Sequence, residues 1–310
     1  MGEESVQRVV ASSRDATASP VSVHVDSWRP SAIASKTEPI GKSTASSWNT
    51  RNLGLRLGAD FTAAAAAGVL VAPIITVIDR GIIENASGRN TLGESIKSSL
   101  RQIIFRPHRF VFSKPFALIF SLYCGTYMTA NSIDTASSTL RTQPACTTTA
   151  GPSKFVATSA SNLALCLYKD SRFTQMFGSP NQIPRPVPAA TFALFTLRDC
   201  LTVFASFNLP PLIAPHLSRQ FGDSLEKHIS SASAAQFLTP AAVQLVSTPL
   251  HLLGLDLYNR ENVRWQERAG KVAKDWAKSC FARIGRIIPA FGVGGVVNMR
   301  VRKGLMEKLE

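Results

Sequence analysis

The segment FTAAAAAGVLVAPIITVI, residues Phe61 to Ile78, contains no charged side chain and is followed directly by Asp79 and Arg80. A helix needs about 20 apolar residues to cross the hydrocarbon core of a bilayer, so this segment has nearly the length of a membrane span. The sequence therefore predicts an all-α membrane protein with six transmembrane helices. A large soluble protein with buried core helices is the alternative, because several of the segments are short for a span. The five further apolar segments are residues 115–130, 155–168, 187–213, 234–255 and 281–297.

Features of these segments recur at a nearly constant interval. Pro115, Leu201 and Pro289 are separated by 86 and 88 residues, and aspartates at positions 79, 170 and 256 are separated by 91 and 86. A fixed interval predicts a fold that repeats one unit, and many transporters are built from repeated groups of helices. We expect three tandem helix-pair repeats after a tail. The predicted divisions are 1–54 for the tail and 55–150, 151–230 and 231–310 for the repeats.

The composition favours a membrane protein over a nucleic-acid-binding protein. The 310 residues are 45% apolar and 17% charged, with a net charge of +14. Soluble domains usually have about 25% charged residues. Basic residues lie between the apolar segments, and no nucleic-acid-binding signature is present. The five cysteines form no CxxC pair, so neither a disulfide framework nor a zinc site is expected.

The first 50 residues contain eleven serines and no apolar periodicity, which predicts a disordered tail. A cleaved mitochondrial presequence is the alternative, although such segments are poor in acidic residues and this one begins with Glu3 and Glu4.

The connections between apolar segments alternate between strongly and weakly basic. Basic connections are retained on the side from which insertion begins. We therefore expect the odd-numbered connections to face the inner compartment and both termini to face the other side. The first connection holds Arg80, Arg89, Lys97, Arg101, Arg106, Arg109 and Lys114, and the fifth holds Arg260, Arg264, Arg268, Lys271, Lys274 and Lys278.

Two of these basic connections have the pattern of surface helices. Thr91 followed by Glu94 is a capping box, which satisfies the free amides at a helix start. Amphipathic basic helices lie at the bilayer surface, and helices facing a protein core are the alternative. The two apolar faces consist of Leu92, Ile96, Leu100, Ile103 and Ile104, and of Trp265, Ala269, Val272 and Trp276.

Charged residues inside the fourth and sixth apolar segments are the candidate substrate-binding residues. They are Arg198 and Asp199 in the fourth segment and Arg283 and Arg286 in the sixth. An ionised side chain within a span normally faces a bundle interior or a water-filled cavity. Consecutive helical residues project about 100° apart, so we expect Arg198 and Asp199 not to pair with each other.

The repeat interval places Arg286 at the depth of Arg198, and the corresponding position of the first repeat is near Phe112, with Lys114 two residues away. A ring of basic groups around a midplane cavity would attract an anion or the acidic part of a zwitterion. Three alternatives remain open: snorkelling of the arginines to the interface, structural pairing, and a loop at 198–199. His251 is expected to be a hydrogen-bond partner between helices.

Residues 283–293, RIGRIIPAFGV, resemble the sixth transmembrane helix of mitochondrial carriers, with its Arg-x-x-Arg-x-x-Pro-x-Phe-Gly-Val pattern. Residues 198–201, RDCL, are similar to the Arg-Asp-x-Pro of the fourth helix, with leucine in place of proline. The resemblance covers roughly residues 55–305. It implies a barrel of three repeats with pseudo-threefold symmetry and surface helices, located in the mitochondrial inner membrane among anionic lipids such as cardiolipin. It also implies substrate contacts at Arg198, Asp199 and Arg286.

The chain departs from the carrier pattern at two places. Carriers have Pro-x-Asp/Glu-x-x-Lys/Arg in their odd helices, whereas here Pro73 is followed two residues later by Ile75 and Pro249 by His251. The glycine-rich segment after the surface helix is replaced by residues 106–109, RPHR. The chain also resembles an uncharacterised group of fungal mitochondrial membrane proteins.

Three classes of function follow from these patterns. The first is a carrier for an organic anion or an amino-acid-like molecule, and the second is a non-transporting membrane scaffold or assembly factor. The third is a membrane-embedded enzyme, but no catalytic, metal-binding or cofactor-binding constellation is recognisable. We therefore expect no enzyme activity and no cofactor, with Arg198, Asp199, Arg286 and Arg283 binding substrate.

Overall fold

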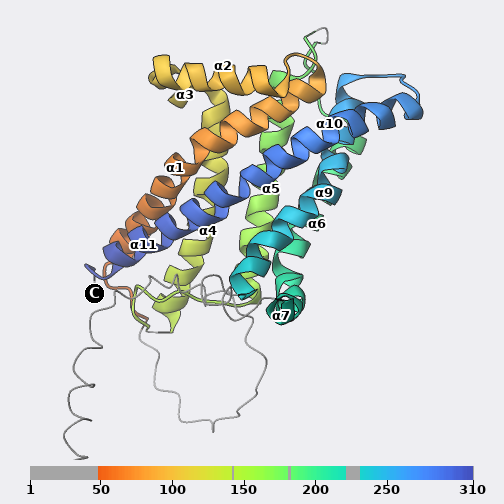
Figure 1. Ribbon diagram of the computed structural model, residues 1–310. Helices are drawn as coiled ribbons and strands as arrows, with labels where there is room; N and C mark the ends of the chain where they lie inside the picture. The colour runs from red at the N-terminus through yellow and green to blue at the C-terminus, as the bar shows by residue number, and fades with distance from the viewer. Residues whose placement is uncertain (1–47, 142, 181–182, 221–230, 310) are drawn as a thin grey trace, which may run out of the picture. The chain divides into compact units, whose positions relative to one another are not determined.

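The computed structural model describes residues 48–141, 143–180, 183–220 and 231–309, which belong to one compact unit, Ser35–Glu310. Most of the predicted tail therefore lies outside the described residues. The described residues form helices and no strand, as predicted (Figure 1). The elements are α1 (Leu53–Ser87), α2 (Leu92–Phe105), α3 (Pro107–Val111), α4 (Lys114–Leu140), α5 (Pro152–Phe177), α6 (Ala189–Asn208), α7 (Pro210–Gln220), α9 (Ser231–Asn259), α10 (Trp265–Gly285), the π-helix η2 (Ile288–Gly294) and α11 (Gly295–Met306).

Four helical stretches among the described residues are long and apolar enough to cross a membrane. They are Leu53–Ser87, Ala189–Ser206, Ala234–Asn259 and Trp265–Met306. They contain most of the first, fourth, fifth and sixth predicted apolar segments. The second and third predicted segments lie in α4 and α5, which are also long helices but are more polar. Six spans in three repeats thus remain a prediction.

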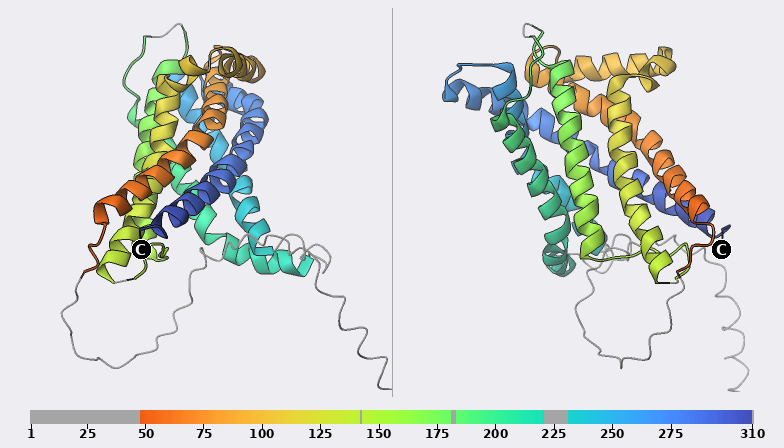
Figure 2. Two further views of the ribbon diagram at one scale, coloured as in Figure 1. Left: turned by 90° about the vertical axis from the view of Figure 1, so that its left-hand side faces the viewer. Right: turned by 180° about the vertical axis from the view of Figure 1, so that it is seen from behind.

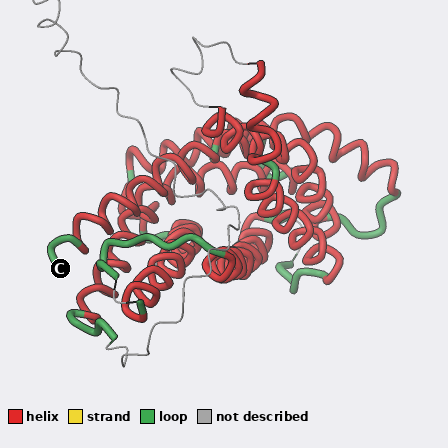
Figure 3. Tube along the Cα trace, turned by 90° about the horizontal axis from the view of Figure 1, so that it is seen from below, coloured by secondary structure: helices red, strands yellow, loops and turns green. Residues whose placement is uncertain are grey.

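The long helices pack in a ring that follows the order of the chain. Helix α1 packs on α4, α4 on α5, α5 on α6, α6 on α9 and α9 on α10. The ring closes because α1 also packs on η2 and α11 (Figure 3). Small residues allow α1 and α4 to approach closely. A Cβ atom on Gly68, for example, would lie 3.2 Å from the ring of Phe120.

The connections between the long helices alternate between the two ends of this ring (Figures 1 and 2). We call one end the α2 end, where the chain passes from α1 to α4, from α5 to α6 and from α9 to α10. The other is the α7 end, where the chain passes from α4 to α5 and where α7 and the C-terminus lie. The predicted alternation of basic and less basic connections therefore corresponds to two ends of the helix ring.

A buried polar cluster joins the first, second and last long helices at the α7 end. Asp60 of α1 accepts a hydrogen bond from Arg302 Nε at 2.7 Å and another from Thr135 Oγ1 at 2.5 Å. Asn131 of α4 and Asn298 of α11 exchange two hydrogen bonds of 2.9 Å. Because the bonds to Arg302 and Asn298 connect residues more than 160 positions apart, they stabilise the closure of the ring.

Helix α2 begins as the sequence predicts. Thr91 Oγ1 accepts from the Glu94 amide at 3.3 Å, and the Glu94 carboxylate accepts from the Thr91 amide at 3.0 Å. The predicted apolar face divides: Leu92, Ile96 and Ile103 pack on the core, whereas the side chains of Leu100 and Ile104 are exposed.

The prediction of a surface helix separate from the sixth span is wrong. Helix α10 runs without a break from Trp265 to Gly285, because no helix-breaking residue separates the two parts. Its inward face is polar, with Arg268 and Arg283 buried, whereas Trp265 on the predicted apolar face is exposed. The ion pair between Arg268 and Asp256, 2.8 Å long, keeps the polar face inward.

Candidate functional site

Charged side chains of both signs meet inside the helix ring, and we call them the interior charge cluster. They come from α1, α5, α6 and the residue that directly follows α10, and most are almost completely buried. Burying several charges in apolar helices is costly unless they are paired. The members of the cluster are Asp79, Lys169, Asp170, Arg198, Asp199 and Arg286.

Asp79 links α1 to two other helices. Its Oδ2 accepts from Lys169 Nζ at 2.8 Å and its Oδ1 accepts from Arg286 Nη1 at 2.6 Å. Lys169 also forms an ion pair with its neighbour Asp170. The two carboxylates and two cations therefore alternate in sign across the interior.

Arg198 continues this chain of charges into α6. Its Nη2 donates to Asp170 at 2.6 Å and to Asp199 at 2.5 Å. The prediction that Arg198 and Asp199 do not pair is wrong. Asp170 draws the long arginine side chain back over the helix, which brings its guanidinium against the next residue. Both residues lie within α6, so the loop alternative is also wrong.

His251 of α9 joins the cluster through Arg198, whose Nη1 lies 2.9 Å from His251 Nδ1. A guanidinium can only donate, so His251 accepts at Nδ1 and carries its proton on Nε2. The imidazole also packs on the ring of Phe195, with 5.1 Å between ring centroids. This confirms the prediction of a hydrogen bond between helices at His251.

The cluster lies at one depth in the helix ring. Asp79, Asp170 and His251 each lie seven or eight residues before the end of α1, α5 or α9. Arg198 lies nine residues after the start of α6. At about 1.5 Å per residue, all four are roughly 10–13 Å from the α2 end of their helices. The charges thus form a layer nearer the α2 end than the α7 end.

Arg283 lies one turn before Arg286 but has a different environment. Its Nε donates to Gln244 Oε1 at 2.8 Å, and no carboxylate of the described chain forms an ion pair with it. The charges of Arg286, Arg198, Asp79 and Asp199 all act on it electrostatically. Arg283 therefore borders the cluster without belonging to its chain of ion pairs.

The predicted basic residue of the first repeat is absent from the interior. Phe112 is 88% exposed, and Lys114 is also exposed. The reason is that α4 begins only at Lys114, so position 112 precedes the helix. The first repeat contributes the opposite charge, through Asp79 on α1. The structure thus contains no ring of three basic groups at these positions.

Asp79, Lys169 and Asp170 were not among the predicted site residues. A signal was present in the regular spacing of aspartates 79, 170 and 256, which predicted the repeat but not a place in the interior. The third of these, Asp256, pairs with Arg260 and Arg268 at the α2 end of α9.

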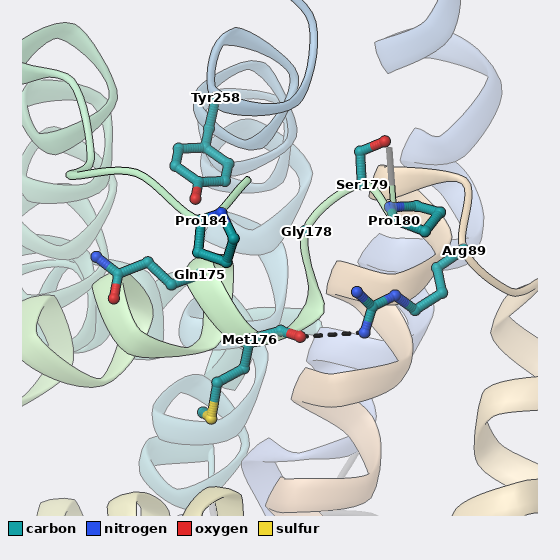
Figure 4. Close-up of a pocket in the computed structure, with 8 residues that line it drawn as sticks. All are labelled: Arg89, Gln175, Met176, Gly178, Ser179, Pro180, Pro184 and Tyr258. Carbon is teal, nitrogen blue, oxygen red and sulfur yellow. Dashed lines mark hydrogen bonds between the residues drawn. The ribbon is translucent and has the colours of Figure 1, made fainter. Parts of the chain in front are cut away.

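A pocket of about 260 Å³ lies at the α2 end, beyond the charge cluster (Figure 4). Arg89 crosses it and donates to the Met176 carbonyl at 3.0 Å. None of the predicted substrate-binding residues lines this pocket. Its lining consists of Arg89, Gln175, Met176, Gly178, Ser179, Pro180, Pro184 and Tyr258.

Residues 63–306 match a protein family described as probable citrulline exporter. The comparison with curated proteins found no match. The matched range contains the whole charge cluster and Arg283. The family match agrees with the prediction that the protein is a transporter. It does not show that the chain is a mitochondrial carrier. The chain belongs to the family of probable citrulline exporters.

Proposed function

We propose that this protein transports citrulline, or a closely related α-amino acid, across a membrane. The observation that carries the proposal is the interior charge cluster, in which carboxylates and guanidiniums are buried among helices apolar enough to span a bilayer. Ionisable residues in such positions usually mark a substrate or ion pathway. The family match supports the same class of function.

The chemistry of the cluster suits an amino acid. Citrulline has an α-carboxylate, an α-ammonium group and an uncharged ureido side chain. Arginine donates in a planar fork that fits a carboxylate, and an aspartate accepts from an ammonium group. We therefore assign substrate binding to Arg198, Asp199, Arg286 and Arg283, and no catalytic activity to the protein.

We further propose six spans arranged as three helix pairs. Each predicted apolar segment lies largely within the long helices, and these pack in a closed ring. The charge cluster connects helices from all three pairs near the α2 end. Passage of a solute through that end requires these ion pairs to separate, so the described arrangement corresponds to a state closed at the α2 end.

We place the protein in the mitochondrial inner membrane, in contact with anionic lipids such as cardiolipin. The support is the net charge of +14 and the surface formed by α2 and α3. On that surface Ile104, Phe105 and Phe112 are exposed beside Arg101 and Arg106. Exposed apolar and basic side chains together are typical of helices at an anionic bilayer surface.

Uptake of labelled L-citrulline by liposomes containing the purified protein tests the proposal. We expect saturable uptake that is higher with cardiolipin in the bilayer and is lost in Arg198→Ala. The matched control is Arg300→Ala, because Arg300 is exposed on α11 and should leave uptake unchanged. Ornithine and glutamate, which carry a net charge, should compete weakly. Uptake equal to protein-free liposomes for every solute would refute transport and favour a scaffold that only retains the fold.

A further inference from the structure

Arg283 is a buried guanidinium whose terminal nitrogens donate to no atom of the described chain. The residue is 2% exposed, and its one hydrogen bond runs from Nε to Gln244. By contrast, Arg198, Arg268 and Arg302 each contact a carboxylate. The side chain of Arg56 lacks a carboxylate but donates to three oxygen atoms.

The surroundings of Arg283 hold it in one orientation. Gln244 Nε2 donates to the Pro240 carbonyl at 3.1 Å, and Ser247 donates to Gln244 Oε1 at 3.2 Å. The amide oxygen is therefore fixed toward Arg283. Because Nε is engaged, the edge formed by the two terminal nitrogens remains free, and this edge can bind a carboxylate through two parallel hydrogen bonds.

The two terminal nitrogens belong to one of the largest fully buried side chains of the described residues. Arg198 and Arg286, which already have carboxylate partners, act on Arg283 by repulsion, whereas Asp79 and Asp199 act on it by attraction. A buried cation in this position is stabilised by an anion. No carboxylate of the described residues forms an ion pair with Arg283, so a substrate carboxylate is the natural partner for its terminal nitrogens.

Asp199 of α6 presents the complementary group. Its Oδ1 accepts from Arg198, but its Oδ2 is enclosed and has no hydrogen-bond donor in the described chain. Asp199 and Arg283 are both linked to α9, Asp199 through Arg198 and His251 and Arg283 through Gln244. The interior thus has an unused acceptor on α6 and an unused donor fork on α10, with opposite charges.

We propose that Arg283, oriented by Gln244, binds the α-carboxylate of the substrate and that Asp199 Oδ2 binds its α-ammonium group. This inference rests on the proposed function in that it assigns a substrate to the same interior. It goes further by dividing the roles within the site: Arg283 and Asp199 hold the two charged groups of the zwitterion, whereas Arg198 and Arg286 border it from the ion pairs that connect the helices. The substrate class is a zwitterionic amino acid, recognised through its backbone groups.

Binding can be measured without transport, by the thermal stabilisation of the purified protein in detergent. The probes are L-citrulline, L-citrullinamide, which lacks the carboxylate, and N-acetyl-L-citrulline, which lacks the ammonium group. We expect only citrulline to stabilise the native chain. A hydrogen bond to a charged group is worth about 1.5–3 kcal/mol, so Arg283→Gln should raise the Kd for citrulline by about 10- to 150-fold. Asp199→Asn should weaken the binding of citrulline, and neither analogue should bind to this variant.

Arg300→Gln, on the exposed face of α11, is the matched control and should bind as the native chain does. Equal stabilisation of the native chain by citrulline and citrullinamide would overturn the assignment of Arg283 to the carboxylate. This comparison uses the native chain alone, so it does not depend on whether a variant folds. Equal stabilisation by the acetylated analogue would overturn the role of Asp199. Selective binding of citrulline by the native protein, without transport, would refute the proposed function but would support the proposed binding site. Absence of binding to all three probes would refute the site.

Discussion

Replacing Asp79 by asparagine removes the carboxylate that lies between two buried cations while keeping the size of the side chain. Asp79 is 5% exposed on its side chain and accepts from Lys169 at 2.8 Å and from Arg286 at 2.6 Å. In the variant Lys169 keeps its pair with Asp170, but Arg286 loses the one carboxylate that it contacts in the described chain.

The size of the effect follows from the burial of these groups. Removing one partner of a buried ion pair costs about 3–5 kcal/mol in the free energy of unfolding. Arg286 is 22% exposed, so solvent screens part of its charge and the lower end of this range, about 3 kcal/mol, is expected. For a chain of 150–250 residues 1 kcal/mol shifts Tm by about 2–4 °C, so in this larger chain Asp79→Asn should lower Tm by roughly 6 °C.

The assay is thermal unfolding of the purified protein in detergent, followed by tryptophan fluorescence. Asp275→Asn is the control, because Asp275 pairs with Lys271 at 3.4 Å within one helix, and its loss should cost at most about 0.5 kcal/mol. Adding Arg286→Gln to Asp79→Asn should cost less than the sum of the two single changes, because the two residues interact directly. A Tm for Asp79→Asn within 2 °C of the native value would refute the assignment of Asp79 as the centre of the charge cluster.

Two further predictions concern packing and a helix start. Gly294→Ala should destabilise the protein by about 1–3 kcal/mol, because its Cβ would lie 2.6 Å from the Tyr127 hydroxyl. Gly295→Ala should not destabilise the protein, because a Cβ atom there would meet nothing within 4 Å. Equal Tm values for the two variants would contradict the close packing of Gly294 against Tyr127. At the start of α2, hydrogen bonds from Thr91 hold the pKa of Glu94 below its ordinary value of 4.5. The stabilisation from this cap is therefore present above that value and lost as the pH falls through the lowered pKa. Thr91→Ala should raise the pKa toward 4.5 in a carbon-13 NMR titration of the carboxyl group, and an unchanged titration would count against the cap.

Local features of the fold were predictable from the sequence. The uncharged segment Phe61–Ile78 lies within α1, and the capping box at Thr91 begins α2 at the predicted residue. Both signals depend on neighbours within a few positions, where periodicity and side-chain chemistry determine the backbone. The continuous α10 was missed because its basic amphipathic part suggested a surface helix and its apolar end suggested the start of a span. No helix-breaking residue separates these two parts.

The interior charge cluster was predictable only in part. Arg198, Asp199, Arg283 and Arg286 were chosen because charges in apolar segments are costly. Their partners were not, because the pairing depends on which helices are neighbours in the ring. Asp79 and Arg286, for instance, are 207 residues apart in the chain. The pair of Arg198 with Asp199 was missed because it depends on the conformation of a long side chain and not on helical geometry.

Counterflow in liposomes tests the central claim, transport of citrulline by this helix ring, most directly. Liposomes containing the native protein are loaded with unlabelled L-citrulline and diluted into a trace of the labelled compound. The account predicts a transient accumulation of label above the equilibrium level, which is absent when the liposomes are loaded with citrullinamide. Label that enters no faster than it enters protein-free liposomes would contradict the account.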